Sequence, residues 1–413
     1  MTFPQSINHQ QAIKLILQQL EKQELLSETI NLNSASGRVL AEPLVAPVDV
    51  PAYDCSRMDG YAVNLKTIQT SNEDKLYTLN LGEPIHAAAQ TESVLCHDQA
   101  VPIMTGGMMP DDANAIILKE QVKLTHNQIE FKVLPKPGQF IRTVGSDIKQ
   151  GELIIRSGQC LNVAHLGIIA SIGINDVKVI KKPSMGLMMT GDELVQPGSN
   201  CLPGQIFDAN TSMLSALLAK MGCEVSVLNG LADTQEAVSE RMALLKHENY
   251  DVVISVGGVS MGDKDWIPAM LAQHGEVVFH KVLIKPGFPM IFGYLNGTLF
   301  YGLPGNPVSA YTTLCQYVFP AIQVLKKQQV QKMLWTAKLS HDLLKTHQRR
   351  EYFRGFYHVD ENGQFNVSIA SNQQSSHIQV LADANCFVVV DQNPQELKVG
   401  SDVLIQPFSQ FFT

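Results

Sequence analysis

Residues 252–266 read VVISVGGVSMGDKDW, an apolar β-branched run that meets a glycine-rich loop and then a cluster of charges. The run predicts a buried strand, and the paired glycines predict its end. Around this stretch, further strand-like runs alternate with segments of helical periodicity. The expected strands are SMGLMMT (184–190), CEVSVLN (223–229) and EVVFHKVLI (276–284), and the expected helices cover 209–222, 233–247 and 266–275. This alternation predicts an α/β domain in which a mixed, mostly parallel sheet lies between helices.

The two flanks of this region have other patterns. Residues 8–26 have apolar positions at helical spacing, whereas 37–180 is divided by Pro and Gly into short β-rich runs with one helix candidate at 162–173. After residue 326 the β signals return. Because 413 residues are too many for one core, the chain is expected to form several domains, with the α/β domain between β-rich ones.

Composition limits the classes of function. The formal net charge of −8 argues against broad binding to nucleic acid or to a membrane surface, although a local basic pocket for a small anion remains possible. The seven cysteines are scattered and form no C-x-x-C pair, which is typical of a reducing compartment. The first residues lack the pattern of a signal peptide, and no apolar run reaches the ~18–20 residues that span a bilayer. A cytoplasmic location is therefore expected.

Four loops are expected at the carboxyl ends of the strands, where open α/β sheets bind their ligands. They contain residues 191–193, Asp233, 257–265 and 304–309. Glycines allow backbone N–H groups to approach an anion closely, and helix N-termini add positive dipole ends. The expected phosphate-binding residues are Gly257, Gly258, Ser260, Gly262, Pro304, Gly305 and Asn306.

The same loops carry the carboxylates of Glu193, Asp233, Asp263 and Asp265. Carboxylates repel a phosphate unless a divalent cation lies between them, and oxygen ligands together with phosphate are the usual environment of Mg²⁺. Lys281 and Lys285 follow nearby in HKVLIKPG and offer positive charge to a second anion. The residues alone therefore indicate a Mg²⁺-assisted site for a phosphorylated small molecule.

Structural explanations compete with this interpretation. Asp263 and Asp265 could simply begin a helix, and Asp233 could be only the N-cap of the helix that follows it. GLPGNP at 302–307 could be only a turn before a helix, in which Pro and Gly are common. The cap of the helix at 209–222 is expected at Asn210, Thr211 or Ser212.

Ser260 raises a separate possibility, because G-V-S-M-G matches the G-x-S-x-G nucleophile elbow of hydrolases and follows a strand. An elbow needs a helix directly after the serine, whereas Gly-Asp-Lys-Asp intervenes here. No HGGG-type oxyanion motif is present either.

Eight motifs, read in order along the chain, carry a family resemblance. They are DVPAYDCSRMDGYAV (49–63), VPIMTGGMMPDDANAIILKE (101–120), GQFIRTVGSDIKQGELI (138–154), MMTGDELV (188–195), SVGGVSMGDKDWI (255–267), IKPGFPMIFG (284–293), YGLPGNPVSA (301–310) and SSHIQVLADANCFVVV (375–390). Together they resemble the MoeA-type molybdopterin molybdenumtransferases, a pattern also seen in the E domain of gephyrin. The resemblance extends over nearly the whole chain.

This resemblance implies a multidomain α/β plus β fold with four domains. They are an elongated linker domain (1–45 and 145–180), a β-rich second domain (46–144), a molybdopterin-binding α/β domain (181–325) and a small C-terminal β-barrel domain (326–413). It also implies a homodimer whose active cleft lies between the α/β domain of one subunit and the second domain of the other.

The implied reaction is the last step of molybdenum cofactor biosynthesis. Adenylylated molybdopterin is bound, Mg²⁺-dependent cleavage releases AMP, and molybdate is ligated to the dithiolene. The implied supplier of the substrate is a MogA-like adenylyltransferase.

The motifs also imply roles for individual residues. Asp59, Thr105 and Arg142 would come from the second domain of the partner subunit, and Glu193, Asp233 and Asp265 would form an acidic rim in which Asp233 and Asp265 hold Mg²⁺. The molybdate pocket would consist of Lys281, Lys285, Pro286, Arg354 and Ser376. Arg, Lys and hydroxyl donors suit the oxygens of a tetrahedral dianion.

Two departures from the family pattern concern charge. The usual K-P-G-K-P is K-P-G-F-P here, so Phe288 stands at the second lysine, and the usual S-A-M-D-G-Y-A has Arg57 in place of the alanine. One cation is lost and one is gained. Two alternatives to the transferase remain open, a serine hydrolase built on Ser260 and a non-catalytic pterin-binding scaffold.

Overall fold

The computed structural model describes residues 5–20, 26–68, 76–85, 95–228, 232–260, 265–330 and 333–412. They divide into two compact units. The larger unit comprises Met1–Glu28, Gly37–Ala41 and Lys178–Thr413, and the smaller comprises Thr29–Ser36 and Glu42–Val177. The finer division into four domains stays a prediction. No helix in the described ranges is long and apolar enough to cross a membrane.

The larger unit contains the expected α/β sheet. Its strands lie in the order β1 (Gln5–Ile7), β19 (Glu276–Val282), β21 (Ile291–Leu295), β22 (Thr298–Leu303), β18 (Val252–Val256), β14 (Ser184–Met189) and β17 (Glu224–Leu228). All neighbours are parallel except β21, which is antiparallel to both β19 and β22. The prediction of a mixed, mostly parallel sheet is therefore confirmed.

The reversal at β21 has a local cause. Leu295 pairs with Thr298, so only Asn296 and Gly297 connect β21 to β22. Their φ angles of 52° and 88° are positive, as a type I′ hairpin turn requires at both central residues. Asn-Gly is the dipeptide that adopts this turn most readily, because both residues tolerate positive φ.

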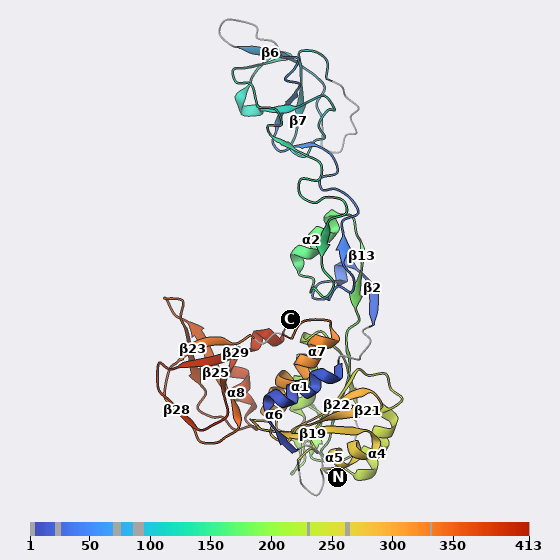
Figure 1. Cartoon of the computed structure of the whole chain (residues 1–413), viewed down its shortest axis with the longest axis vertical. Helices are drawn as coiled ribbons and strands as arrows, with labels where there is room; N and C mark the ends of the chain where they lie inside the picture. Colours follow the sequence, from blue (N-terminus) through green and yellow to red (C-terminus); the bar gives the residue numbers. More distant parts are fainter. Residues whose placement is uncertain are drawn as a thin grey trace. The chain divides into compact units, whose positions relative to one another are not determined.

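Helices cover both faces of this sheet (Figure 1). On one face lie α1 (His9–Leu20), α3 (Ala209–Lys220), α6 (Pro307–Thr313) and α7 (Phe319–Leu325), and on the other α4 (Gln235–Leu245) and α5 (Ile267–His274). Within β18, Val252 and Ile254 pack on the first face and Val253 on the second, as the two-residue repeat of a strand dictates. Residues 21–25, the end of the helix expected over 8–26, lie outside the described residues.

The helix caps differ from expectation. Asp208 caps α3 by accepting a hydrogen bond from the Thr211 amide at 3.0 Å, so the prediction of Asn210, Thr211 or Ser212 as the cap is wrong. Thr234 caps α4 by accepting from the Ala237 amide at 3.2 Å. Asp233 is therefore not a cap, and the purely structural explanation for its carboxylate does not apply.

After the α/β region the chain forms a closed β-barrel. Its strands, each paired with the next around the ring, are β25 (Arg350–Val359), β26 (Phe365–Ile369), β23 (Trp335–Leu339), β29 (Asp402–Pro407) and β27 (Cys386–Val390). The short β20 (Ile284–Lys285) pairs with β25 and aligns Lys285 with Glu351. The expected C-terminal β-barrel is confirmed, and it is tied to the α/β region at this pairing.

The smaller unit is β-rich, as expected. Its main sheet has the order β8 (Ala115–Leu118), β5 (Gly60–Val63), β7 (Gln99–Ile103), β6 (Tyr77–Leu81), β10 (Gln128–Phe131) and β9 (Lys123–Thr125). The short strands β4 (Cys55–Ser56) and β11 (Ile141–Arg142) form a separate pair. The helix expected at 162–173 is α2 (Val163–Ser171), which begins with a capping box between Asn162 and His165.

Candidate functional site

An acidic pocket of about 620 Å³ lies at the carboxyl ends of β14, β18 and β22. We call it the acidic pocket because four carboxylates line it, those of Glu193, Asp208, Asp233 and Asp265. Gly257, Gly258, Ser260, Pro304, Gly305 and Asn306 line it as well. The structure thus brings together the three expected acidic-rim residues and the described phosphate-binding candidates of the strand-end loops, whereas Thr105 and Arg142, also expected to bind substrate, do not line this pocket. Gly262 and Asp263 lie outside the described residues.

Glycines permit the close packing of these loops. Gly257 follows β18 with a φ of +94°, and a Cβ there would lie 2.7 Å from the backbone oxygen of Thr190. A Cβ on Gly305 would lie 3.6 Å from the Cα of Gly257. Three strand ends therefore meet at backbone distance, which leaves main-chain groups rather than side chains near the floor of the pocket.

Asn210, a residue of this pocket that sequence analysis considered only as a helix cap, has an unusual environment. Its Nδ2 donates a hydrogen bond to the Gly305 carbonyl at 2.7 Å. Its Oδ1 is buried and has no hydrogen-bond partner in the described part of the chain. Because Asp208 provides the cap, Asn210 is available to present a polar atom at the pocket.

The oxygen-rich lining fits a hard divalent cation such as Mg²⁺. Among the described residues, however, no three Asp, Glu, His or Cys side chains are grouped closely enough to hold an ion by themselves. Mg²⁺ is usually bound by one or two carboxylates together with substrate phosphates. The acidic pocket therefore fits a cation that arrives with a phosphorylated ligand better than one held permanently by the protein.

Ser260 lines the acidic pocket but lacks the environment of a nucleophile. No histidine is among the described residues that line this pocket. Nearby His280 lies with its Nε2 at 3.0 Å from the Val259 carbonyl, and burial lowers the pKa of its imidazole. The helix after the loop begins only at Ile267. A serine that follows a strand without an adjacent base is not activated.

A second pocket, of about 910 Å³, adjoins the acidic one. We call it the serine pocket after Ser309, Ser371, Ser375 and Ser376, which line it. Lys285 and Arg349 also line it, and no Asp or Glu is among its described lining residues. The two pockets share Pro289, Pro304, Asn306 and Ser376, so they are continuous. Hydroxyls, amides and cations without carboxylates are the groups that bind an oxyanion.

Lys285 lies at the edge of the serine pocket, held by a buried acid. Its Nζ is 2.9 Å from Glu351 Oε1, and the Glu351 side chain is only 4% exposed. His347 Nε2 is 2.8 Å from the other oxygen of Glu351. Burial, followed by the charges of Lys285, Lys345 and Arg349, lowers the pKa of His347 although Glu351 opposes this shift. Pro286 lines the same pocket.

Two of the residues expected to hold molybdate are placed differently. Arg354 is 1% exposed and is not among the residues that line the serine pocket. Its guanidinium is buried, with Nε and Nη2 lacking hydrogen-bond partners in the described ranges, and burial lowers its pKa to about 10. Its backbone N–H donates to Gln373 Oε1 at 2.9 Å, which fixes a side chain that does line the pocket. Lys281 lines neither pocket and lies with its Nζ 6.0 Å from the centre of the Phe288 ring.

The remaining candidates belong to the smaller unit. Asp59 Oδ1 accepts hydrogen bonds from both the backbone N–H and the hydroxyl of Thr105, each at 2.8 Å. These two bonds lower the pKa of Asp59 and hold its carboxylate in one orientation. Arg142 forms an exposed ion pair with Asp147 at 2.9 Å.

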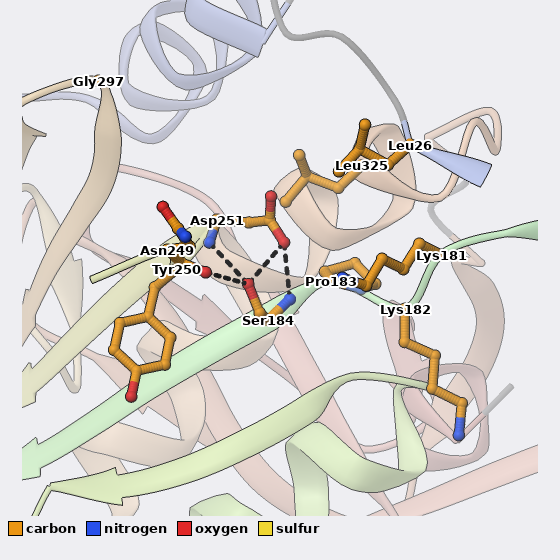
Figure 2. A pocket seen from close by; sticks show the side chains of 10 residues that line it. All are labelled: Leu26, Lys181, Lys182, Pro183, Ser184, Asn249, Tyr250, Asp251, Gly297 and Leu325. Carbon is orange, nitrogen blue, oxygen red and sulfur yellow. Dashed lines mark hydrogen bonds between the residues drawn. The ribbon is translucent and has the colours of Figure 1, made fainter. Parts of the chain in front are cut away.

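A further pocket of about 480 Å³ lies at the opposite, amino ends of β14, β18 and β22 (Figure 2). Lys181 and Lys182 line it, but Asp251 also does, and Ser184 donates to that carboxylate from both its N–H and its hydroxyl. Ser184 and Asp251 thus bond to each other. In open α/β sheets the carboxyl ends of strands are the usual binding edge, which favours the acidic and serine pockets as the functional site.

Family models match most of the chain. Residues 7–173 match the model described as MoeA N-terminal region (domain I and II), 186–324 match a probable molybdopterin binding domain, and 336–408 match the MoeA C-terminal region (domain IV).

Individual relatives agree with these matches. The chain is 39% identical to the molybdopterin molybdenumtransferase of Haemophilus influenzae, over 93% of this chain and 94% of that protein. It is 32% identical to the molybdopterin molybdenumtransferase of a Nostoc species, over 92% of this chain and 88% of that protein. Among solved structures it is similar to the molybdopterin biosynthesis MoeA protein of Pyrococcus horikoshii, with a TM-score of 0.82, 27% identity and coverage of 98% and 100% of the two chains.

Proposed function

Because the chain belongs to the MoeA family of molybdopterin molybdenumtransferases, we propose that it transfers molybdate to adenylylated molybdopterin and releases AMP, the last step of molybdenum cofactor biosynthesis. A single observation carries this proposal. A carboxylate-lined pocket adjoins a second pocket whose described lining has serines and cations but no carboxylate, and the two share Asn306 and Ser376. A reaction that joins a phosphorylated pterin to an oxyanion needs two such sites side by side.

In the acidic pocket, the chain binds the phosphoanhydride of the adenylylated substrate. Backbone groups of the Gly257–Gly258 loop and of Gly305 would contact the phosphates, and Asp233 and Asp265 would hold Mg²⁺. Mg²⁺, when bound, offsets the negative charge that develops on the phosphate oxygens. Water adds to one phosphorus, the anhydride bond breaks, and AMP and the pterin phosphate are the two products.

In the serine pocket, the chain holds molybdate beside the dithiolene. Lys285 supplies positive charge, Ser376 supplies a hydroxyl donor at the boundary of the two pockets, and Gln373 supplies an amide. Arg354 contributes indirectly, because its main-chain N–H and carbonyl form hydrogen bonds with the Gln373 side chain and hold it in place. Molybdate is a substrate here, so the pocket must bind it and then release it to the sulfurs.

The active form in this proposal is a homodimer in which the smaller unit of the partner subunit completes the cleft with Asp59, Thr105 and Arg142. The Asp59 carboxylate is fixed by Thr105 and solvent-exposed. Met58 and Met104, which adjoin these two residues in sequence, are 44% and 48% exposed, as expected of a surface that another subunit covers. A MogA-like adenylyltransferase would supply the substrate in the cytoplasm.

The testing experiment measures AMP release from adenylylated molybdopterin, with and without molybdate and Mg²⁺. Release that requires both is expected. Asp265→Asn should lower kcat/KM by about 10²-fold or more, because it removes a charge that holds the metal. Ser260→Ala should cost less than about 10-fold, as expected for loss of one neutral hydroxyl donor.

Other outcomes would favour the alternatives. Hydrolysis of p-nitrophenyl acetate that disappears in Ser260→Ala would support a serine hydrolase. Tight binding of the adenylylated substrate without turnover under any metal condition would support a pterin-binding scaffold.

A further inference from the structure

We propose that Asp192 is a positioning residue of the acidic pocket. It holds the main chain of Asp233 by a hydrogen bond and thereby fixes two carboxylates of the pocket, those of Glu193 and Asp233, relative to each other. This inference rests on the proposed function, since it takes Asp233 to hold Mg²⁺. It assigns a role to a residue for which the motifs implied none.

The first step concerns where the two segments lie. β14 and β17 are neighbouring parallel strands, and Met188 pairs with Leu228 at their carboxyl ends. The chain therefore leaves both strands at the same edge of the sheet. β14 ends at Met189, shortly before Asp192, and β17 ends at Leu228, shortly before Asp233. The topology thus brings together two acids that are 41 positions apart.

The second step concerns the bond that joins them. Asp192 Oδ1 accepts a hydrogen bond from the backbone N–H of Asp233 at 3.0 Å. Asp233 directly precedes Thr234, the N-cap of α4, so its N–H lies outside the hydrogen-bond ladder of that helix and pairs with another segment instead. The Asp192 carboxylate therefore ties the start of α4 to the loop that follows β14.

The third step concerns which acids face the pocket. Glu193 and Asp233 line the acidic pocket, whereas Asp192 is not among its described lining residues. Gly191 also lines the pocket, and a Cβ there would lie 2.8 Å from Glu193 Oε2, so the missing side chain leaves room for that carboxylate. The adjacent acids Asp192 and Glu193 thus differ in what they contact. Asp192 acts through Asp233 rather than on the ligand.

The fourth step concerns what the bond does for a metal site. The carbonyl of Glu193 accepts a hydrogen bond from Ile206 N at 2.8 Å, so β16 holds the loop after β14. Asp233 is held on its other side by Thr234, the cap of α4. The Asp192 bond joins these two supported segments. Mg²⁺ requires near-ideal octahedral geometry, so its affinity falls when a carboxylate that holds it can move.

Two substitutions distinguish this role from a role of the charge itself. Asp192→Asn keeps an oxygen that can accept the hydrogen bond, whereas Asp192→Ala removes the acceptor. The first measurement is amide hydrogen exchange at Asp233 in the protein without ligands. Exchange should be faster by about three- to tenfold in Asp192→Ala, the ratio that corresponds to one hydrogen bond. It should change less than about twofold in Asp192→Asn.

The second measurement is the Mg²⁺ concentration that gives half-maximal AMP release at saturating adenylylated molybdopterin and molybdate. Asp192→Ala should raise this concentration by about three- to tenfold, and Asp192→Asn by less than about twofold. The KM for molybdate should stay the same in both variants. Asp192→Ala combined with Asp233→Asn should need no more Mg²⁺ than Asp233→Asn alone, because a residue that acts through another adds nothing once that other is lost.

Asp342→Ala provides a matched control. Asp342 Oδ1 also accepts a hydrogen bond from a distant backbone N–H, that of Val399 at 2.8 Å. Asp342 follows β23 of the barrel and is not among the described residues that line the acidic or the serine pocket. Its loss should leave both the exchange at Asp233 and the Mg²⁺ requirement unchanged.

Two results would overturn the inference. One is an equal rise of the Mg²⁺ requirement in Asp192→Asn and Asp192→Ala, which would show that the charge of Asp192 acts directly. The other is wild-type exchange at Asp233, or a wild-type Mg²⁺ requirement, in Asp192→Ala. Absence of Mg²⁺-dependent AMP release in the wild-type protein is a failure of the proposed function instead. The exchange measurement, which needs neither substrate nor metal, then decides whether Asp192 positions Asp233.

Discussion

Gly257→Ala provides a direct test of how the loops around the acidic pocket are packed. The substitution has two costs. An L-residue at a φ of +94° is strained by about 1–2 kcal/mol. The new Cβ would also lie 2.7 Å from the Thr190 backbone oxygen and 2.8 Å from Thr190 Oγ1, closer than real Cβ contacts allow. Overpacking of this kind costs about 1–3 kcal/mol, so the total is about 2–5 kcal/mol.

A matched glycine isolates the steric part of this cost. Gly37 has a φ of +74°, and a Cβ there would meet no atom within 4 Å. Gly37→Ala should therefore lower the free energy of unfolding only by the backbone strain of an L-residue at positive φ, about 1–2 kcal/mol. Urea unfolding of both variants should show Gly257→Ala to be less stable than Gly37→Ala by about 1–3 kcal/mol.

The same pair of variants connects packing to activity. In Gly257→Ala the loops after β14 and β18 must move apart, and displacement of substrate-positioning groups by about 1 Å can cost about 10²-fold in rate. The rate of molybdate-dependent AMP release should therefore fall by up to about 10²-fold in Gly257→Ala, and it should stay at the wild-type level in Gly37→Ala. Equal stability of the two variants together with full activity in both would refute the close approach on which the pocket geometry depends.

Two further predictions concern His280 and His347, and the acid beside Lys285. Burial lowers the pKa values of His280 and His347 in the folded protein, so below about pH 6.5 the unfolded chain binds more protons and the free energy of unfolding should decrease as pH falls. Urea midpoints measured from about pH 7.5 to 5.5 check this, and a constant or rising midpoint would contradict it. Glu351→Gln should destabilise the protein by about 1–3 kcal/mol, because it weakens a buried ion pair whose Lys285 partner is 42% exposed. Glu396→Gln removes a charge from an exposed ion pair, so it should lower the free energy of unfolding by less than about 1 kcal/mol in the same urea assay. Equal losses of stability in Glu351→Gln and Glu396→Gln would argue against a special role for Glu351.

Much of the α/β region and its acidic pocket could be predicted from sequence, because local pattern and topology determine both. Apolar runs and helical periodicity located the strands and helices. Once the strands are parallel, their carboxyl ends meet at one edge, which is why Glu193, Asp233 and Asp265 line one pocket despite their separation in sequence. The family resemblance, now confirmed by the matches over nearly the whole chain, supplied the multidomain arrangement.

Some errors arose from local signals that were present but overlooked. The Asn296-Gly297 hairpin turn, which makes β21 antiparallel, is a strong signal for two adjacent strands. Asp208, directly before the helix at 209–220, is as good a cap as Asn210 by residue type. Attention to the turn chemistry at each boundary would have located the hairpin and corrected the cap prediction.

The serine pocket could not be derived from local pattern. Its lining joins a loop at 285–289 to Arg349 and to 371–376, and β20 pairs with β25 to bring the first two together. Neither the ion pair of Lys285 with Glu351 nor the contact of Arg349 with Phe288 has a signal at short sequence distance. Arg354 shows the converse, because the family resemblance implied a direct ligand while the barrel buries its side chain.

Ser260 shows why the position of a loop in the fold is a better guide to its function than a short sequence motif. The strand and glycines that produce the G-x-S-x-G match also direct the Val259 carbonyl toward His280, whose Nε2 lies 3.0 Å away. A proton donated to that carbonyl leaves the ring nitrogen unable to accept one from a serine, and burial disfavours the charged imidazolium that a general base must form. The same loop leads on to Asp265, which lines the acidic pocket with Asp233. The described lining of the acidic pocket does not include His280 and offers carboxylates and main-chain donors, a set suited to a metal-bound phosphate rather than to an acyl-enzyme.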